Sequence, residues 1–203
     1  MIDLTRDGPW ATLTIDRQDK ANSLTGEMLE TLADAVEALN TDPSVKVLIL
    51  TGRGKVFSAG ADLDEARAGL ATSPVWERLS GALAASPLFT VAALNGTAAG
   101  GALGMVFAVD VRISVAKANI FYPVMKLGFL PQPSDPGRLA ALVGPARAKL
   151  ILMGGAKVSA VDAHAMGLID RIEDDPLAAA KLVAEDALAA DRSHVAGIKA
   201  LFS

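Results

Sequence analysis

The sequence predicts an α/β fold built around one sizeable core. Short apolar runs of strand length alternate along the chain with longer stretches whose apolar residues recur at helical spacing. Apolar residues make up 51% of the chain and aromatic residues only 4%, so we expect a core of Ala, Val, Leu and Ile, which suits helices packed on buried strands. The length of 203 residues is enough for one domain and leaves little for a second.

The first predicted unit is a strand, a helix and a second strand. Residues 10–15 alternate between apolar and polar side chains, as a half-buried strand does, and the polar residues 16–20 end the pattern. Thr25 is a suitable N-cap for an amphipathic helix that ends near Asn40, and the branched residues of 45–51 are typical of a buried strand. This order predicts a right-handed crossover between two parallel strands.

A loop of small residues, GRGKVFSAGADL, follows at positions 52–63. It contains Gly-x-Gly-Lys, but the spacing of a P-loop is absent because Val56 stands where Ser or Thr is required. The loop therefore excludes a nucleotide triphosphatase of that type. Segments 64–69 and 74–85 after it are predicted to be helical.

The central feature of the sequence is a strand, two adjacent glycines and a helix. Residues 89–94 read as an apolar strand, Asn95-Gly96 as a turn, and Gly100-Gly101 as the entrance to a helix-compatible apolar segment. Residues without Cβ let another molecule approach the backbone, and the first N–H groups of a helix have no partner inside it. Such a place suits a polarised carbonyl or an oxyanion. The alternative is that the glycines only allow two elements to pack closely.

The rest of the chain continues the alternation of strands and helices. Three prolines make residues 131–137 a rigid loop, so the helix after them is expected to begin only beyond Pro136. The other predicted elements are a strand at 111–115, an extended piece at 119–124, helices at 138–143, 145–153 and 159–166, a strand at 168–172 and a final alanine-rich helix at 176–190.

Composition excludes several classes of partner. A net charge of −4 with scattered basic residues argues against nucleic acid. The chain has no cysteine, and His164 and His194 are not at a metal-ligand spacing, so neither a disulfide nor a metal site is expected. Residues 1–7 do not read as a signal peptide, and no apolar run reaches membrane-spanning length. We therefore expect a soluble cytoplasmic protein that does not bind a membrane.

Ordered motifs along nearly the whole chain, to about Ile172, resemble the crotonase superfamily, also called the enoyl-CoA hydratase/isomerase superfamily. The resemblance implies an α/β spiral of β-β-α units with surrounding helices, assembled as a homotrimer or a dimer of trimers. We expect a core at 1–175 and a shortened C-terminal segment with one helix at 176–203. The motifs are Asn22-Ser23-Leu24, the loop from Gly54 to Leu63, Asn95-Gly96 with Gly100-Gly101 and Asp110, the segment 126–131 and the segment 165–169.

The resemblance also implies a binding site for an acyl-CoA of fatty acid metabolism. The amides of Ala61 and Gly101 match the family's oxyanion hole for the thioester carbonyl. The backbone around Ser58, Ala59 and Gly60 matches the part that holds the adenine end of CoA. Further expected contacts are Lys20, Asp62, Leu63, Gly100 and Gln132, with Lys20 and Lys55 near the phosphates. Asp62 is also open to a purely structural role, and no cofactor besides the CoA thioester itself is expected.

Two glutamates that hydratases of this family use as acid and base are missing. Their matching positions are Gly104 and Val124, whose side chains cannot transfer a proton. Hydration by the usual mechanism is therefore not expected, nor is isomerisation that relies on the second glutamate. Asp135 is the first candidate to replace them, because burial beside an acyl chain raises a carboxyl pKa; Asp64 and Glu65 are further candidates. The alternative for each is an exposed surface carboxylate.

The resulting prediction is a non-hydratase acyl-CoA enzyme, namely an isomerase, a lyase or a thioester hydrolase. One alternative is a non-catalytic acyl-CoA carrier or sensor that keeps the binding frame without acid–base groups. Another is a structural subunit without a ligand, which predicts bulky side chains in the space beside Gly101. Tyr122 is expected to be a core residue.

Overall fold

Two β-sheets form the centre of the molecule in the computed structural model, which describes residues 1–202. The larger sheet has the order β1-β2-β3-β5-β7-β10, and the smaller sheet has the order β4-β6-β8-β9. Neighbouring strands are parallel except for β1 with β2 and β8 with β9. The strands are β1 (Ile2–Asp7), β2 (Trp10–Ile15), β3 (Val47–Gly52), β4 (Val56–Ser58), β5 (Phe89–Leu94), β6 (Thr97–Ala99), β7 (Val111–Ser114), β8 (Asn119–Phe121), β9 (Val158–Ser159) and β10 (Arg171–Ile172).

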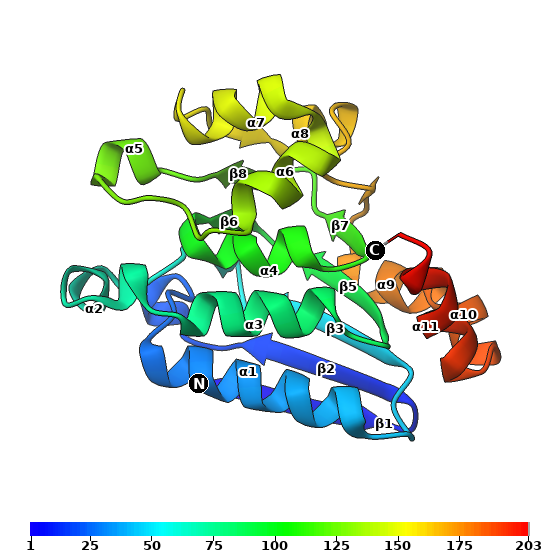
Figure 1. Cartoon of the computed structure of the whole chain (residues 1–203). Helices are drawn as coiled ribbons and strands as arrows, with labels where there is room; N and C mark the ends of the chain where they lie inside the picture. Colours follow the sequence, from blue (N-terminus) through cyan, green and yellow to red (C-terminus); the bar gives the residue numbers. More distant parts are fainter. Residues whose placement is uncertain (203) are drawn as a thin grey trace.

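From β3 to β8, strands of the two sheets alternate along the chain, and each pair is followed by helices. β3 and β4 precede α2 and α3, β5 and β6 precede α4, and β7 and β8 precede α5 and α6 (Figure 1). This repetition confirms the predicted spiral of β-β-α units. The helices are α1 (Gly26–Thr41), α2 (Leu63–Arg67), α3 (Val75–Ala84), α4 (Leu103–Ala108), α5 (Val124–Leu127), α6 (Asp135–Val143), α7 (Pro145–Leu152), α8 (Ala160–Ala165), α9 (Pro176–Val183), α10 (Glu185–Ala189) and α11 (Arg192–Ala200).

Helix α1 forms as its sequence pattern predicts. Thr25 is its N-cap, and the Thr25 hydroxyl accepts a hydrogen bond from the amide of Met28 at 3.2 Å. The apolar side chains at helical spacing, among them Leu29, Leu32 and Val36, are fully or almost fully buried. The parallel pairing of β2 with β3 on either side of α1 in the chain confirms the predicted crossover.

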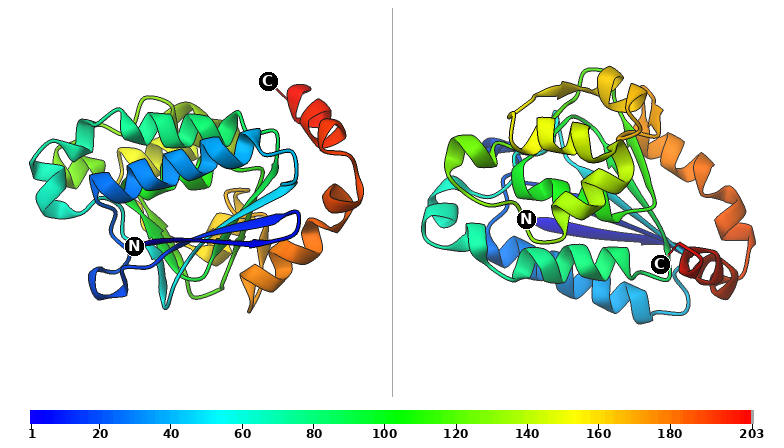
Figure 2. Two further views of the ribbon diagram at one scale, coloured as in Figure 1. Left: turned by 90° about the horizontal axis from the view of Figure 1, so that it is seen from below. Right: turned by 45° about the horizontal axis from the view of Figure 1, so that its top comes forward.

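Apolar side chains cover both faces of the larger sheet. On one face Leu13, Leu48 and Leu94 belong to the main core, together with residues of α1, α3 and α4. On the other face Val47, Ile49 and Val91 pack with alanines of α9. Figure 2 shows α1 and α3 on one side of this sheet and α9 on the other. The sheet is therefore held between two helical layers, which suits its mainly parallel strands.

Several predicted boundaries were wrong. Helix α6 begins at Asp135, before Pro136, because the first turn of a helix does not need the N–H that proline lacks. Of the strand predicted at 168–172, only β10 forms. The loop 52–63 contains β4, and the extended piece at 119–124 divides into β8 and the start of α5.

The C-terminal segment also differs from the single helix that was predicted. Asp175 caps α9, which ends at Val183, and α10 and α11 follow it. The ammonium group of Lys46 donates hydrogen bonds to the carbonyls of Leu188 and Ala190 at 2.8 and 2.7 Å. These contacts hold the end of α10 against the start of β3, so tertiary contacts contribute to where this helical segment ends.

Neither a membrane span nor a metal cluster is found in residues 1–202. None of the helices in that range has both the length and the apolar character needed to cross a bilayer. The same range contains no cluster of His, Asp and Glu side chains that could hold a metal ion.

Candidate active site

Two loops meet backbone to backbone at Gly60 and Gly100. Both residues have positive φ, +93° and +58°. A Cβ atom on Gly60 would lie 2.8 Å from the carbonyl oxygen of Ala99 and 3.1 Å from the Cα of Gly100. Glycine is required here because any side chain would push the loops apart.

The β4–α2 loop is also tied to the segment before α1. The amide of Leu24 donates to the Gly60 carbonyl, and the amide of Asp62 donates to the Leu24 carbonyl, both at 2.8 Å. Ala61 lies between these two bonds and one residue beyond the contact glycine, as Gly101 lies one residue beyond Gly100. The predicted pair of amides therefore comes from two loops that the fold holds against each other.

The amides of Ala61 and Gly101 are available for a ligand. Outside the regular ladders of helices and strands, neither donates a hydrogen bond to a backbone carbonyl of residues 1–202. Gly101 lies in the first turn that leads into α4, where amides have no partner within the helix. The helix dipole adds partial positive charge at this end. A carbonyl oxygen placed there would have its developing negative charge stabilised.

The indole of Trp76 forms one wall beside Gly101. A Cβ atom on Gly101 would lie 3.1 Å from two carbons of this ring, so the missing side chain makes room for Trp76. A cavity of about 80 Å³ is left beside the ring, and both amide-bearing loops line it. The bulky side chain expected of a structural subunit is thus present, but it fills only part of the space.

The Ser58 side chain shapes the loop from inside. Its hydroxyl donates to the Asn22 carbonyl at 2.7 Å and accepts from the Gly60 amide at 3.2 Å. The Ala59 amide donates to the Ala21 carbonyl at 3.0 Å. Ser58 is fully buried, whereas Ala59 and Lys20 are exposed. The structure therefore brings Ser58 and Ala59 against the segment that directly follows Lys20, with the Ser58 hydroxyl turned away from the surface.

The acidic residues after this loop have structural partners. Asp62 forms an ion pair with Arg17 at 2.8 Å and accepts from the first amides of α2, and the Arg17 hydrogen bond is the main cause that lowers the pKa of Asp62. Glu65 accepts from the Gly26 amide at 2.7 Å. Asp64 is largely exposed and lies 3.5 Å from Arg67. None of these carboxylates lines the cavity, while Leu63 does.

Asp135 is fully buried, contrary to the alternative of an exposed carboxylate. Its Oδ2 atom accepts a hydrogen bond from the Tyr122 hydroxyl at 2.8 Å, and its Oδ1 atom has no hydrogen-bond partner among residues 1–202. A Cβ atom on Gly104 would lie 2.9 Å from Oδ1. The carboxyl group thus occupies the space into which a side chain at position 104 would project. The predicted substitute lies beside the position of one missing glutamate.

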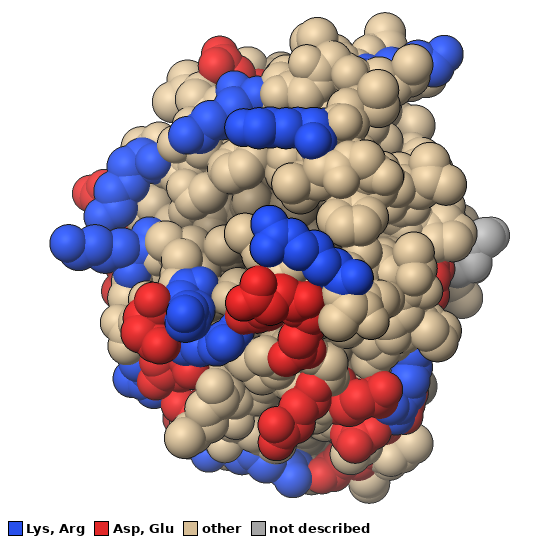
Figure 3. Space-filling model, turned by 90° about the vertical axis from the view of Figure 1, so that its left-hand side faces the viewer, with Lys and Arg blue, Asp and Glu red and all other residues tan. Residues whose placement is uncertain are grey.

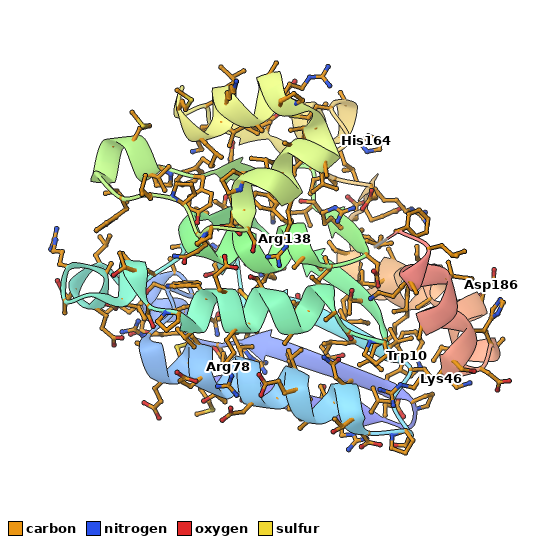
Figure 4. The ribbon with its side chains drawn as sticks, in the orientation of Figure 1. Trp10, Lys46, Arg78, Arg138, His164 and Asp186 are labelled. Atoms are coloured by element: carbon orange, nitrogen blue, oxygen red, sulfur yellow. The ribbon has the colours of Figure 1, made fainter. Side chains whose placement is uncertain are left out.

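Burial is the largest influence on the pKa values of Asp135 and Tyr122. Burial raises the pKa of Asp135 to about 6, although the Tyr122 hydrogen bond and the charge of Arg138 lower it and the charge of Glu77 raises it. Burial and the nearby Asp135 charge also raise the pKa of Tyr122. Arg138 extends from α6 toward α3 (Figure 4), and Glu77 of α3 accepts hydrogen bonds from Ser134. Asp135 is therefore poised to exchange a proton near neutral pH.

Tyr122 is buried and belongs to the main core, as predicted, and it also contributes to the wall of the cavity. It lines the cavity together with Val124 and Gln132, and the Gln132 amide donates to the Ala71 carbonyl at 2.9 Å. Tyr122 is the single tyrosine of the chain and directly precedes Pro123. The sequence does not predict its hydrogen bond with Asp135, because this contact depends on tertiary packing between the end of β8 and the start of α6.

A larger cavity of about 960 Å³ lies away from these loops. It is bounded by the end of α3, the start of β5 and the helices α10 and α11. The ammonium group of Lys199 at its wall is already bound by Asp110 and by the Leu88 carbonyl, each at 2.9 Å. None of the predicted site residues lines this cavity.

The chain belongs to the enoyl-CoA hydratase/isomerase family within the crotonase superfamily, since the family model for enoyl-CoA hydratase/isomerase matches residues 7–203. A Mycobacterium tuberculosis protein named "Probable enoyl-CoA hydratase EchA14" is 37% identical over 196 residues, covering 94% of this chain and 76% of that protein. The 1,2-epoxyphenylacetyl-CoA isomerase of Escherichia coli is 31% identical over 173 residues, covering 81% and 66%. An enoyl-CoA hydratase structure from Bacillus anthracis has a TM-score of 0.88 at 29% identity, covering 98% and 80%.

Proposed function

We propose that this protein binds an acyl-CoA thioester and catalyses an enolate-forming reaction of the isomerase or lyase type without hydration. The thioester carbonyl is proposed to lie on the amides of Ala61 and Gly101. The observation that carries the proposal is the buried Asp135 carboxyl beside Gly104, with one oxygen free of hydrogen bonds among residues 1–202. It supplies an ionisable group where both usual glutamates are absent.

The amides of Ala61 in the β4–α2 loop and of Gly101 at the entrance of α4 support stabilisation of an enolate. Removal of one such donor lowers enzymatic rates by about 10²–10³, so the pair is expected to be effective even with a single acid–base group nearby. The Escherichia coli relative is by its name an isomerase of an acyl-CoA. The amide pair favours proton transfer at the carbon next to the thioester, and the relative's name favours the isomerase type.

The burial of Asp135 argues against its direct contact with a water molecule in the cavity. A general base for hydration or hydrolysis must contact a water molecule, but Asp135 has no exposed surface. Gly104 and Val124 offer no other acid or base. Hydration or thioester hydrolysis with Asp135, Gly104 or Val124 as the direct base is therefore not supported.

The CoA moiety is proposed to lie along the β4–α2 loop, with no separate cofactor. The exposed Lys20, Lys55 and Lys126 are on or beside the segments that border the cavity, and they suit the phosphates as mobile charges. Figure 3 views the side of the molecule where α2 and α5 lie. Lys and Arg side chains are found on both halves of this face, whereas most Asp and Glu side chains are on the lower half, so the upper half carries mainly basic charge. This distribution supports phosphate binding on the upper half.

The second candidate is a non-catalytic acyl-CoA carrier or sensor. It is favoured by one observation: the cavity lining is apolar apart from Tyr122 and Gln132, and Asp135 does not reach it directly. For both candidates we propose a role in fatty acid metabolism, which the family resemblance implies, and a cytoplasmic location, as expected from the sequence.

Calorimetric titration with crotonyl-CoA, octanoyl-CoA and free CoA, together with an absorbance assay for the enoyl double bond, tests the proposal. We expect acyl-CoA to bind more tightly than free CoA and crotonyl-CoA to keep its double bond. Rapid hydration of crotonyl-CoA contradicts the argument from Gly104 and Val124. Absence of binding contradicts both candidates.

A further inference from the structure

Resting on the proposed function, we infer that Tyr122 is the catalytic side chain that exchanges a proton with the bound acyl group, and that Asp135 acts through it as its positioning residue and proton acceptor. The two residues thus act as one proton-transfer pair, although they come from different elements. Tyr122 follows β8, and Asp135 begins α6.

The geometry places Tyr122 between the cavity and the carboxylate. Tyr122 lines the cavity, whereas Asp135 lies behind it and has no exposed surface. Within residues 1–202, Tyr122 is the only ionisable side chain of the cavity lining. Its hydroxyl donates to Asp135 Oδ2 at 2.8 Å. Tyr122 is thus the lining residue that connects the cavity to Asp135, and its hydroxyl is the proposed route for the proton.

The proposed step conserves atoms and charge. The Oη atom of Tyr122 takes a proton from the α-carbon of the thioester while its own hydroxyl proton passes to Asp135 Oδ2. The electron pair of the broken C–H bond moves to the thioester oxygen, which becomes an enolate oxygen on the amides of Ala61 and Gly101. Tyr122 is neutral before and after, and the reverse transfer returns a proton to carbon.

The electrostatics of the pair favour this coupled transfer. Burial and the Asp135 charge raise the pKa of Tyr122, so a free tyrosinate is disfavoured and its proton must leave as the new one arrives. Burial makes Asp135 a stronger base than an ordinary aspartate, with a pKa of about 6. Besides Tyr122, the charged groups that act on Asp135 are Arg138 on α6 and Glu77 on α3.

Gly104 is the structural condition for the pair. A Cβ atom there would lie only 2.9 Å from Asp135 Oδ1, so any larger residue requires the carboxylate to shift. Gly104 stands at the position that matches one of the two missing glutamates, and its lack of a side chain leaves room for the carboxyl group of Asp135. Gly104 therefore explains both why α4 lacks a proton-transfer group and why Asp135 can lie beside it.

Exchange of the α-protons of butyryl-CoA in D₂O, followed by NMR, tests the inference with Tyr122→Phe. This variant keeps the ring in the cavity wall and removes only the hydroxyl. We expect butyryl-CoA to bind within about twofold of wild type and exchange to fall about 10²-fold or more at every pH. Ser80→Ala is the matched control, because it removes a buried, unpartnered hydroxyl of α3 outside the cavity, and it is expected to exchange like wild type.

The pH profile separates the relay from direct catalysis by Asp135. If Asp135 acted directly, Tyr122→Phe would keep its plateau rate and only move its midpoint upward, because the lost hydrogen bond is one of the causes that lower the pKa of Asp135. That result overturns the inference while leaving the proposed function intact. If wild-type protein binds acyl-CoA without exchange, the proposed catalysis itself fails.

A second measurement does not depend on the folding of Tyr122→Phe. Because Tyr122 is the single tyrosine of the chain, growth with 3-fluorotyrosine labels this position alone. We expect its ¹⁹F resonance to shift on binding of butyryl-CoA and to titrate with a midpoint near the Asp135 pKa of about 6. In Asp135→Asn the titration near this pH should disappear. A ¹⁹F chemical shift that changes neither with the ligand nor with pH contradicts the inference.

Discussion

At the scale of the residue, Asp135 combines full burial with a carboxyl group that titrates near neutral pH. Its pKa is about 6 in the folded protein, above the ordinary value of 3.8. The folded protein therefore holds a proton that the unfolded chain has lost between roughly pH 4 and pH 6. The contribution of this group to stability is fully present below that window and is lost as the pH rises through it.

Asp135→Asn is expected to gain stability relative to wild type as the pH rises. The difference in the free energy of unfolding should change by about 2–3 kcal/mol between pH 4 and pH 7.5, because asparagine has no charge to bury. Urea unfolding at the two pH values measures it. A difference that stays constant with pH would show that the folded state does not perturb this carboxyl.

Asp135 could be chosen from the sequence only as one acid among several. The missing glutamates at Gly104 and Val124 showed that a substitute was needed, and Asp135 was the first of three candidates, with Asp64 and Glu65 as the others. The partner Tyr122 could not be found in this way. Its contact with Asp135 and the approach of Asp135 to Gly104 are tertiary, and neither leaves a local pattern in the chain.

At the scale of the element, the contact between the β4–α2 loop and the entrance of α4 positions the two amides. Gly60→Ala tests it, because the new Cβ atom would lie 2.8 Å from the Ala99 carbonyl and the backbone has a φ of +93°. We expect a loss of stability of about 1–3 kcal/mol or more and weaker acyl-CoA binding. Thermal unfolding and calorimetric titration measure the two effects.

Gly8→Ala is the matched control for this prediction. Gly8 also has a positive φ, +56°, but nothing lies within 4 Å of the position that its Cβ would take. This variant should lose stability through the backbone alone and keep its affinity for acyl-CoA. Equal affinity in both variants would show that the loop contact does not position the amides.

Elements with strong local signals were predicted well, and those set by tertiary contacts were not. The capping and spacing of α1 and the branched run of β3 are local properties, and both elements formed with small changes at their ends. β1 was missed, since its middle and end are exposed and its pairing with β2 is what holds it. No glycine or proline lies at the boundary between α9 and α10, so the sequence does not indicate that α9 ends there.

At the scale of the whole molecule, the arrangement of the two sheets was accessible only through the family resemblance. Periodicity predicts strands, but it does not say that β3, β5 and β7 lie in one sheet and β4, β6 and β8 in another. The division at residue 175 stays a prediction. α9 packs on the same sheet as the preceding core, through Ala179, Ala180 and Ala184.

A homotrimer or a dimer of trimers is our proposal for the assembly in solution. Leu150 on α7, Met153 just after it and Val161 on α8 are 57%, 65% and 57% exposed, which supports an interface with another copy. Size-exclusion chromatography with light scattering should give three or six times the chain mass of 20.9 kDa. A mass of one chain at micromolar concentration contradicts the proposal.

The central claim is that a buried Asp135 replaces the missing glutamate pair, and α-proton exchange measures this most directly. Wild type and Asp135→Asn are compared for exchange of butyryl-CoA protons in D₂O across the pH range. We predict a wild-type rate that rises to a plateau with a midpoint near pH 6, the pKa of Asp135, and a variant that binds butyryl-CoA but exchanges at least about 10²-fold more slowly. Equal rates in the two proteins would contradict the claim.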